Sequence, residues 1–224
     1  MKMYTLAASA ALALSLAASA GAVTVPFTET FSSAANNWST ASVLSPVNLV
    51  ATGGPDGSQF ANRTFSFSAA NTGDQAILFR GQTNFGSSGG NLHGNYLTSG
   101  VTDLSLFVRN DSPVALDFFV RFGTPNPGAG VVFLASAVPA NSWTMINVPI
   151  SMSTPFIYEG APTLFSTVFA NVGRIQVGVV VPASLALSTP SYNFDLDSVS
   201  IVPAPSAAVA LLGTGAVALR RRRR

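Results

Sequence analysis

The sequence contains no cysteine, so no disulfide can stabilise the fold and no thiolate is available as a nucleophile or metal ligand. It contains a single histidine, which excludes a metal site built from several histidines. Charged residues make up only 9% of the 224 positions. A surface of Ser, Thr, Asn and Gly therefore replaces a charged one, as is common in exported proteins that associate with an extracellular matrix.

Basic residues are almost absent from the body of the chain. Six of the 11 Lys and Arg residues lie at the two ends, and residues 23–202 hold five arginines, no lysine and nine acidic residues. This segment therefore carries a net charge of −4, although the whole chain is at +2. Nucleic-acid binding requires a clustered basic face, which the sequence does not provide.

Catalytic motifs are also scarce. Many of the nine carboxylates occur in turn sequences such as Pro55-Asp56-Gly57, where turn chemistry accounts for them. A glycoside hydrolase needs two facing carboxylates. Of the functions that we consider for this chain, hydrolysis of glycans therefore has the least support. His93 lies in a Gly/Asn-rich stretch and is interpreted as a loop histidine. We therefore expect a protein that is not an enzyme.

The N-terminus has the composition of a secretory signal peptide. A short segment with one positive charge at Lys2 precedes an uncharged Ala/Leu run over residues 5–17. Small residues then form two candidate cleavage sites, which end at Ala20 and Ala22, and we expect cleavage after Ala22 by signal peptidase. A buried helix or a membrane anchor is the alternative, but the run is shorter than the ~20 residues that a spanning helix requires.

The body from residue 23 to residue 202 shows β periodicity throughout. About ten short strands are expected, separated by Gly, Pro and Asn turns. Residues 104–109 and 114–122 are predicted to pair as a hairpin across the turn 110–113, and residues 131–135 to continue the meander. One short helix is predicted over residues 163–170, and residues 81–100 form a long Gly-rich loop. This pattern predicts a single antiparallel β-sandwich domain.

The C-terminus combines a helix-breaking Pro-Ala-Pro sequence, 13 small or apolar residues from Ala207 to Leu219, and a basic tail made of Arg220, Arg221, Arg222, Arg223 and Arg224. We expect the apolar segment, like the signal peptide, to be helical. Arginine crosses a bilayer only at high cost, so this tail would stay on the cytoplasmic side. A plain tail anchor is the alternative, although 13 residues are few for a span of ~20.

This order of features resembles the PEP-CTERM sorting signal of Gram-negative exported proteins. The motif residues here are Val202, Pro203, Ala204, Pro205 and Ser206, with Ala204 at the position where the family has a glutamate. The resemblance makes residues 203–224 a sorting segment, so the expected order is the signal peptide at residues 1–22, the body at 23–202 and the sorting segment. It implies transient anchoring in the inner membrane, processing by an exosortase-type enzyme, and delivery to the cell surface or the extracellular matrix.

The body resembles jelly-roll carbohydrate-binding and galactose-binding-like domains in three stretches, residues 29–38, 142–149 and 192–201. In such domains the first and last strands are neighbours, which would bring Glu29 to Asp197, with Asp195 nearby. The resemblance therefore implies a structural calcium ion, since hard cations need clustered oxygen ligands. The alternative is that these carboxylates are solvated strand ends or turn caps.

Aromatic residues offer possible stacking faces for sugar rings, among them Trp38, Trp143 and Tyr96. Tyr96 lies in the Gly-rich loop and is the ligand-binding residue that we predict, although aromatic residues in β-proteins more often belong to the core. The sequence thus predicts an exported protein with a structural or adhesive role at the cell surface or in the polymer matrix. A carbohydrate-binding module that recognises extracellular polysaccharide is the main alternative.

Overall fold

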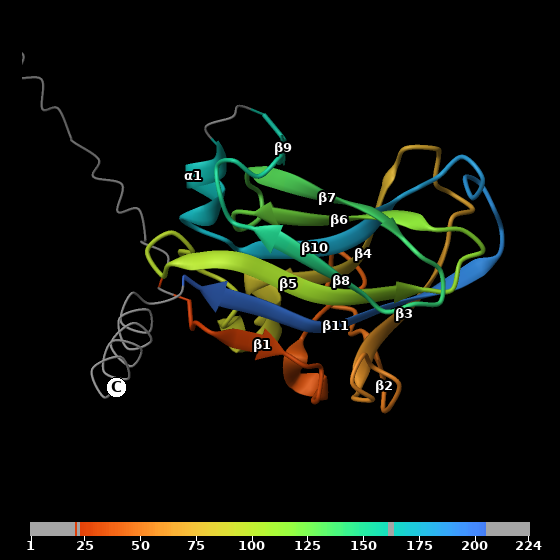
Figure 1. Ribbon diagram of the computed structural model, residues 1–224, viewed down its shortest axis with the longest axis horizontal. Coiled ribbons are helices and arrows are strands. Elements are labelled where there is room, and N and C mark those ends of the chain that lie inside the picture. Colours follow the sequence, from red (N-terminus) through yellow and green to blue (C-terminus); the bar gives the residue numbers. More distant parts are fainter. Residues whose placement is uncertain (1–20, 22, 161–163, 205–224) are drawn as a thin grey trace, which may run out of the picture.

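Two antiparallel β-sheets pack face to face in the computed structural model, which describes residues 21, 23–160 and 164–204 (Figure 1). The predicted β-sandwich of jelly-roll type is confirmed. One short helix, α1 (Leu164–Phe169), lies within the predicted helical range and sits at one end of the sandwich. No helix in the described part of the chain is long and apolar enough to cross a bilayer.

The first sheet has six strands, and the last strand of the chain lies at its centre. Its order is β2-β3-β11-β5-β8, with β1 added beside β11. The predicted neighbourhood of the first and last strands is therefore present. The strands are β1 (Phe27–Glu29), β2 (Asn48–Val50), β3 (Phe60–Ser66), β5 (Val101–Asn110), β8 (Thr144–Pro149) and β11 (Ser191–Pro203).

The second sheet has five strands in the order β4-β10-β6-β7-β9. The hairpin between β6 and β7 continues the meander as the sequence predicted. The strands are β4 (Gln75–Gln82), β6 (Leu116–Gly123), β7 (Gly130–Val138), β9 (Ile157–Tyr158) and β10 (Arg174–Val180).

The predicted hairpin between residues 104–109 and 114–122 is wrong. Both segments are strands, but β5 belongs to the six-stranded sheet and β6 to the five-stranded sheet. Asn110 and Ser112 are buried in the connection, where Ser112 Oγ donates to Asn110 Oδ1 and to the Val114 carbonyl. The turn sequence therefore forms an arch between the layers, which local periodicity cannot distinguish from a hairpin.

The core fills the space between the two sheets with alternating apolar residues. On β6, Phe118 and Phe122 point inward and are fully buried, while the intervening Phe119 points outward and is buried as well. The outer face of the sheet is therefore covered at Phe119. Its ring lies over Gly178 of β10, where a Cβ would approach Phe119 Cζ to 2.5 Å.

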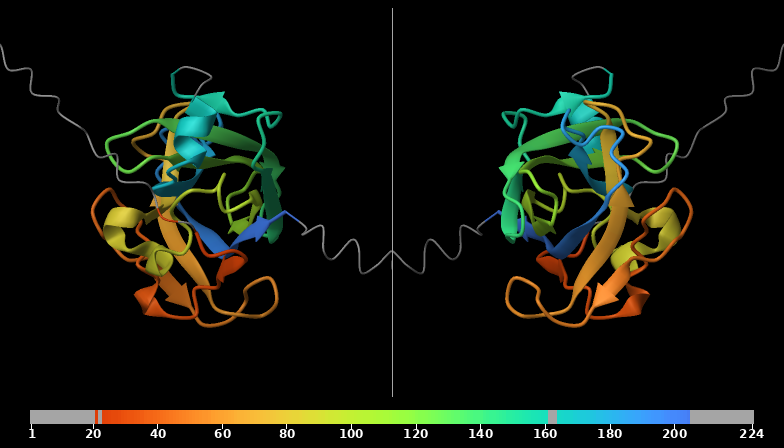
Figure 2. Two further views of the ribbon diagram at one scale, coloured as in Figure 1. Left: turned by 90° about the vertical axis from the view of Figure 1, so that its left-hand side faces the viewer. Right: turned by 90° about the vertical axis from the view of Figure 1, so that its right-hand side faces the viewer.

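The segment 81–100 is not an open loop. It contains two 3₁₀ helices, η2 (Thr83–Phe85) and η3 (Ser87–Gly90), and it buries Leu92 and Tyr96 completely. A third 3₁₀ helix, η1 (Ala34–Asn36), lies beside η3. Figure 2 shows α1 and the 83–100 segment at the rim of the same end of the sandwich.

Both described ends of the chain meet at this end of the sandwich (Figure 1). Asn95 N donates to the Gly21 carbonyl, and Val23 N donates to Ser99 Oγ. At the other terminus, Ala204 N donates to the Gly100 carbonyl. The folded domain thus continues through the first residues of the predicted sorting motif. The predictions made for Ala20, Ala22, Pro205, Ser206 and the basic tail concern residues outside those described.

Candidate functional site

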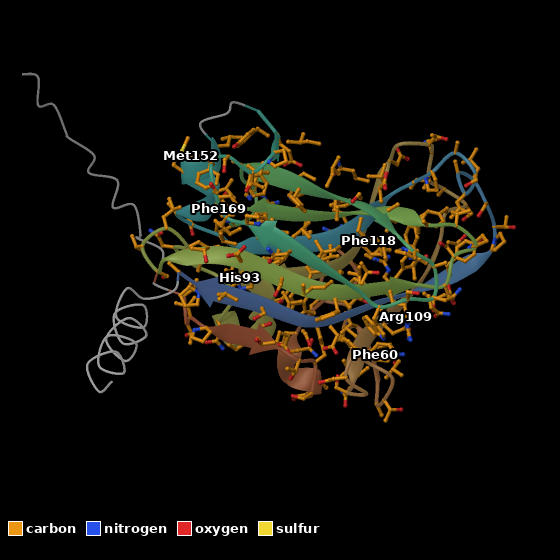
Figure 3. The ribbon with its side chains drawn as sticks, in the orientation of Figure 1. Phe60, His93, Arg109, Phe118, Met152 and Phe169 are labelled. Carbon is orange, nitrogen blue, oxygen red and sulfur yellow. The ribbon has the colours of Figure 1, made fainter. Side chains whose placement is uncertain are left out.

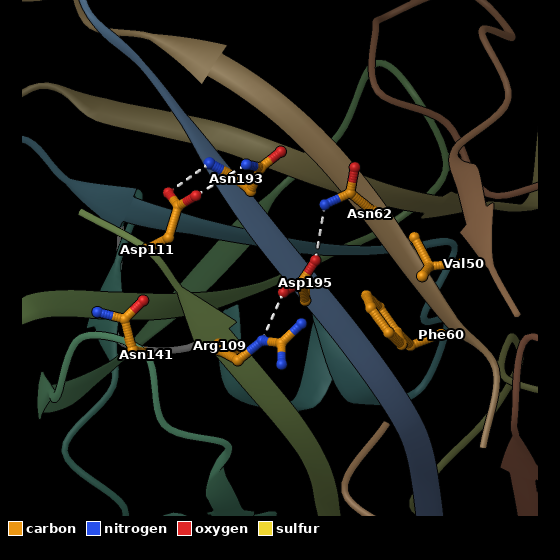
Figure 4. Close-up of a pocket in the computed structure, with 8 residues that line it drawn as sticks. All are labelled: Val50, Phe60, Asn62, Arg109, Asp111, Asn141, Asn193 and Asp195. Carbon is orange, nitrogen blue, oxygen red and sulfur yellow. Dashed lines mark hydrogen bonds and ion pairs between the residues drawn. The ribbon is translucent and has the colours of Figure 1, made fainter. Parts of the chain in front are cut away.

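A cleft of about 410 Å³ lies on the outer face of the six-stranded sheet (Figure 4). Its walls combine two apolar side chains with six polar or charged ones. They are Val50, Phe60, Asn62, Arg109, Asp111, Asn141, Asn193 and Asp195.

Strand alternation places the polar floor of the cleft. Antiparallel register puts Asn62 of β3 and Arg109 of β5 on either side of Asp195 of β11. The flanking residues Phe194 and Leu196 point into the core and are fully buried, so Asp195 must point outward. The Asn62 amide, the Asp195 carboxylate and the Arg109 guanidinium therefore lie in one row across three neighbouring strands.

Asp195 joins this row into a fixed network. Its Oδ1 accepts a hydrogen bond from Asn62 Nδ2 at 2.7 Å, and its Oδ2 accepts one from Arg109 Nε at 2.8 Å. Asp195 is only 3% exposed, whereas the Arg109 side chain is 31% exposed. The carboxylate thus anchors an arginine whose far end reaches the solvent side of the cleft.

Arg109 also lies over two aromatic rings. Its guanidinium carbon is 5.2 Å from the centre of the Phe60 ring and 4.9 Å from that of Trp143. The two rings meet edge to face at 5.3 Å, and Trp143 Nε1 donates to the Gly53 carbonyl at 2.8 Å. Figure 3 shows Arg109 and Phe60 together, away from His93. Stacking and the ion pair together fix the guanidinium in one orientation.

A second polar group forms the opposite rim. Asp111 Oδ1 and Oδ2 accept hydrogen bonds from Asn193 N and Nδ2 at 2.6 and 2.7 Å. Asn141 adds an exposed side chain on a left-handed backbone, with φ at 59°. Within the described residues, neither the Asn141 carboxamide nor Nη1 and Nη2 of Arg109 form a hydrogen bond. These groups are oriented donors and acceptors that remain free for a ligand.

The calcium prediction requires correction. Among the described residues, no three acidic or histidine side chains gather in a way that could hold a metal ion. Glu29 instead accepts from Phe31 N at 2.8 Å, and Asp197 accepts from Ser58 Oγ and Ser198 N. The pairing of β1 with β11 places Glu29 and Asp197 on adjacent strands. Each of the two carboxylates nevertheless accepts hydrogen bonds from protein groups of its own.

The prediction that Tyr96 contacts a ligand is also wrong. Tyr96 is fully buried, and its hydroxyl donates to the Leu92 carbonyl at 2.8 Å. Burial of the phenol raises its pKa. Trp38, another candidate, is fully buried with Nε1 donating to Ser88 Oγ. Of the aromatic candidates, Trp143 is the one beside the cleft, and its position beside Arg109 could not be deduced from local sequence.

One motif was missed at the sequence level. Residues 86–90 match the Gly-x-Ser-x-Gly pattern of hydrolase nucleophile elbows, with Ser88 at the central position. Ser88 is 5% exposed and has a left-handed backbone with φ at 54°. Its hydroxyl accepts from Trp38, and among the described residues no hydrogen bond joins Ser88 to His93. The serine is therefore a packing residue in this loop and lacks the paired base of a triad.

No family model matches the chain, and no curated protein matches it significantly. Solved structures of similar shape are found. One holds the CBM22-1 and GH10 modules of the xylanase 10B of Clostridium thermocellum complexed with xylohexaose, at 16% identity and a TM-score of 0.49. The match covers 80% of this chain and 28% of that longer chain.

Two isolated modules from Clostridium thermocellum are also similar. A family 11 carbohydrate-binding module matches at 15% identity and a TM-score of 0.45, covering 82% of this chain and 97% of the module. A family 30 carbohydrate-binding module matches at 9% identity and a TM-score of 0.44, covering 83% and 96%. At these values the likeness describes the shape of the sandwich and assigns no ligand to this chain.

Proposed function

We propose that this chain is an exported binding protein without catalytic activity, and that its cleft on the six-stranded sheet binds a polysaccharide of the extracellular matrix. An adhesive role at the cell surface would follow from that binding. The terminal sequences support the export and the sorting. The similar carbohydrate-binding modules are compatible with the proposal, but the cleft carries it.

The observation that carries the proposal is the guanidinium of Arg109, held by Asp195 against two aromatic rings with Nη1 and Nη2 left free. Sugars present hydroxyl groups beside apolar C–H faces, so their sites combine a few oriented polar groups with an apolar wall. Arg109, Asn62 and Asn141 supply polar groups here, and Phe60 and Val50 supply the wall.

The same geometry argues against hydrolysis. Only two carboxylates line the cleft, Asp111 and Asp195. Each already accepts two hydrogen bonds from protein groups. A glycosidase needs one carboxyl group as acid and a second facing it across the bond that is cleaved. Asp195 is committed instead to orienting Asn62 and Arg109.

The test is affinity electrophoresis of the full chain in gels containing xylan, mixed-linked β-glucan, cellulose derivatives or agarose. Three variants are compared with the wild type. Arg109→Gln removes the free donors, and Asn141→Gly removes a carboxamide while tolerating the left-handed backbone. Asn147→Ala is the matched control, because Asn147 is an exposed amide on β8 outside the cleft.

We expect at least one polysaccharide to retard the wild type and Asn147→Ala equally. Arg109→Gln should weaken binding about tenfold, the usual effect of losing a hydrogen bond to a charged group. Asn141→Gly should weaken it less. The urea midpoint of each variant shows whether it is folded. Absence of retardation by every polymer, or equal loss in Asn147→Ala, would refute the cleft as the binding site.

A further inference from the structure

Three of the five arginines in the body stand on the five-stranded sheet, and the side chain of a fourth, Arg63 of β3, reaches that sheet at β4. The central row of this group runs across three strands, from Arg80 of β4 through Gln176 of β10 to Arg121 of β6. The neighbours Ile175 and Val177 are core residues, so the row lies on the outer face of the sheet, away from the other layer.

Three arginines of this group have assigned partners. Arg121 forms an ion pair with Glu159 and donates through Nη1 to Gln176 Oε1 at 2.9 Å. Arg174 Nε donates to the Thr124 carbonyl at 2.7 Å, and its Nη2 donates to that of Gly128. Arg63 Nη1 donates to the carbonyl groups of Ile77 and Leu78. Each of these guanidinium groups therefore holds a part of the fold.

Arg80 is different. Its Nε is shielded from solvent and has no hydrogen-bond partner, and no ion pair involves its guanidinium within the described residues. The charges around it have the same sign, since Arg63 and Arg121 both act on it electrostatically. Burial and the Arg121 charge together lower the pKa of Arg80.

The local charge balance is also uneven. Within the described part of the chain, Glu159 is the one carboxylate that acts on this group, and it is already bound by Arg121. A net positive group therefore sits on a body whose overall charge is −4. A half-buried guanidinium without an anion is costly, and its planar fork fits two oxygens of one oxyanion.

We propose that Arg80, together with Gln176 and Arg121, is a binding site for the oxyanion groups of an acidic polysaccharide, carboxylate or sulfate. Arg80 provides the unpaired fork. Gln176 is 3% exposed and is held by Arg121, so its amide forms a fixed floor. This site lies on the opposite sheet from the cleft and does not depend on it.

The experiment uses the full chain and three polymers with one backbone: dextran, carboxymethyl dextran and dextran sulfate. Because the C-terminal arginines also attract anions, the readout is the difference between variants that keep this tail. Arg80→Gln removes the fork, and Arg80→Lys keeps the charge without the fork. Asn147→Asp is the matched control, because it lowers the net charge by one at an exposed position on the other sheet outside the cleft, and Arg109→Gln tests the cleft.

We expect one of the charged dextrans to bind the wild type and Asn147→Asp equally, and to bind Arg80→Gln and Arg80→Lys at least about fivefold more weakly. The polymer that responds identifies the anion. Equal binding by Arg80→Gln and the wild type would overturn the proposal. If Arg80→Gln does not fold, the test rests on Arg80→Lys. Full affinity of Arg80→Lys for the charged dextrans would show that the planar guanidinium is not needed and would overturn the proposal.

Loss of binding in Arg109→Gln, with full binding in Arg80→Gln, would place charged-polymer recognition in the cleft and overturn the arginine row. Binding of neutral polymers reports on the cleft separately. The two proposals can therefore fail independently.

Discussion

Asp195 controls the chemistry of the cleft through its two neighbours. It is buried, it accepts from Asn62 and Arg109, and it lines the cleft itself. Removing its charge would leave Arg109 over the aromatic rings with no counter-charge. The residue would therefore serve both the stability of the fold and the proposed binding.

We expect Asp195→Asn to lower the free energy of unfolding by about 1 to 3 kcal/mol, less than for a fully buried ion pair because Arg109 is partly solvated. Urea denaturation checks this value. Asp103→Asn is the control, since Asp103 on the same face accepts only from the exposed Asn147. Equal losses in both variants would show that the ion pair contributes nothing specific.

His93 should make the domain sensitive to acid. Burial lowers the pKa of His93 to about 4, below its usual 6.5. Between these two values the unfolded state binds more protons than the folded state, so the free energy of unfolding falls as the pH drops from 6.5 to 4. The shift corresponds to about 3 kcal/mol.

This prediction is checked by urea midpoints measured at pH 7.5, 6 and 4.5 for the wild type and His93→Leu. The wild type should lose stability through this window, and the variant should show a much smaller loss. Parallel curves for the two proteins would show that carboxylates, rather than His93, govern the acid response.

At the level of elements, the fold was largely predictable and the site was not. Alternating residues identified nearly every strand, because a half-buried strand must alternate. The assignment of β5 and β6 to different sheets depends on packing around Asn110 and Ser112, which no local pattern encodes. The cleft joins Asn62, Arg109 and Asp195 from three distant segments, so their proximity follows from register alone.

Strand β10 has a site where packing tolerates no side chain. The register between β10 and β4 shifts after Val177, and Gly178 lies beneath the Phe119 ring. A Cβ at Gly178 would collide with the Ala76 carbonyl oxygen as well as with that ring. Because the Ala76 backbone and the Phe119 ring confine Gly178 from two sides, the surrounding structure cannot easily make room for a side chain.

We therefore expect Gly178→Ala to cost about 3 kcal/mol of unfolding free energy. Thermal and urea unfolding of the full chain measure it. Gly73→Ala provides the comparison, because space around Gly73 is open and the strain would come only from placing alanine on a backbone with φ at 84°. That variant should lose about 1 kcal/mol. A smaller loss at Gly178 than at Gly73 would contradict the packing described.

For the whole molecule, the arrangement of the ends bears on processing. Val23 is 7% exposed, and Ala204 is hydrogen-bonded to Gly100, so folded structure begins and ends directly beside the two predicted signals. An exosortase-type enzyme acting at the Pro-Ala-Pro sequence would therefore work directly against the folded surface.

We expect the protein recovered from its native host to lack both terminal signals and to be found in the surface or extracellular fraction. Intact mass spectrometry of each fraction measures this. We expect Val23 as the first residue and a C-terminus close to Ala204. A mass that retains residues 207–224, found in the membrane fraction, would instead identify a plain anchor, and Ala204 would then be a departure that prevents processing.

Strand β11 contains both Asp195 of the cleft and the last residues before the C-terminal segment. While the C-terminal segment still anchors the chain, a polymer bound at the proposed cleft site would load this single strand along its length, over about 30 Å. The strand is held by β5 on one side and by β3 and β1 on the other. Its hydrogen bonds run perpendicular to the pull, so many must break at once. Such a load would act in shear across the sheet rather than peel the strands apart bond by bond.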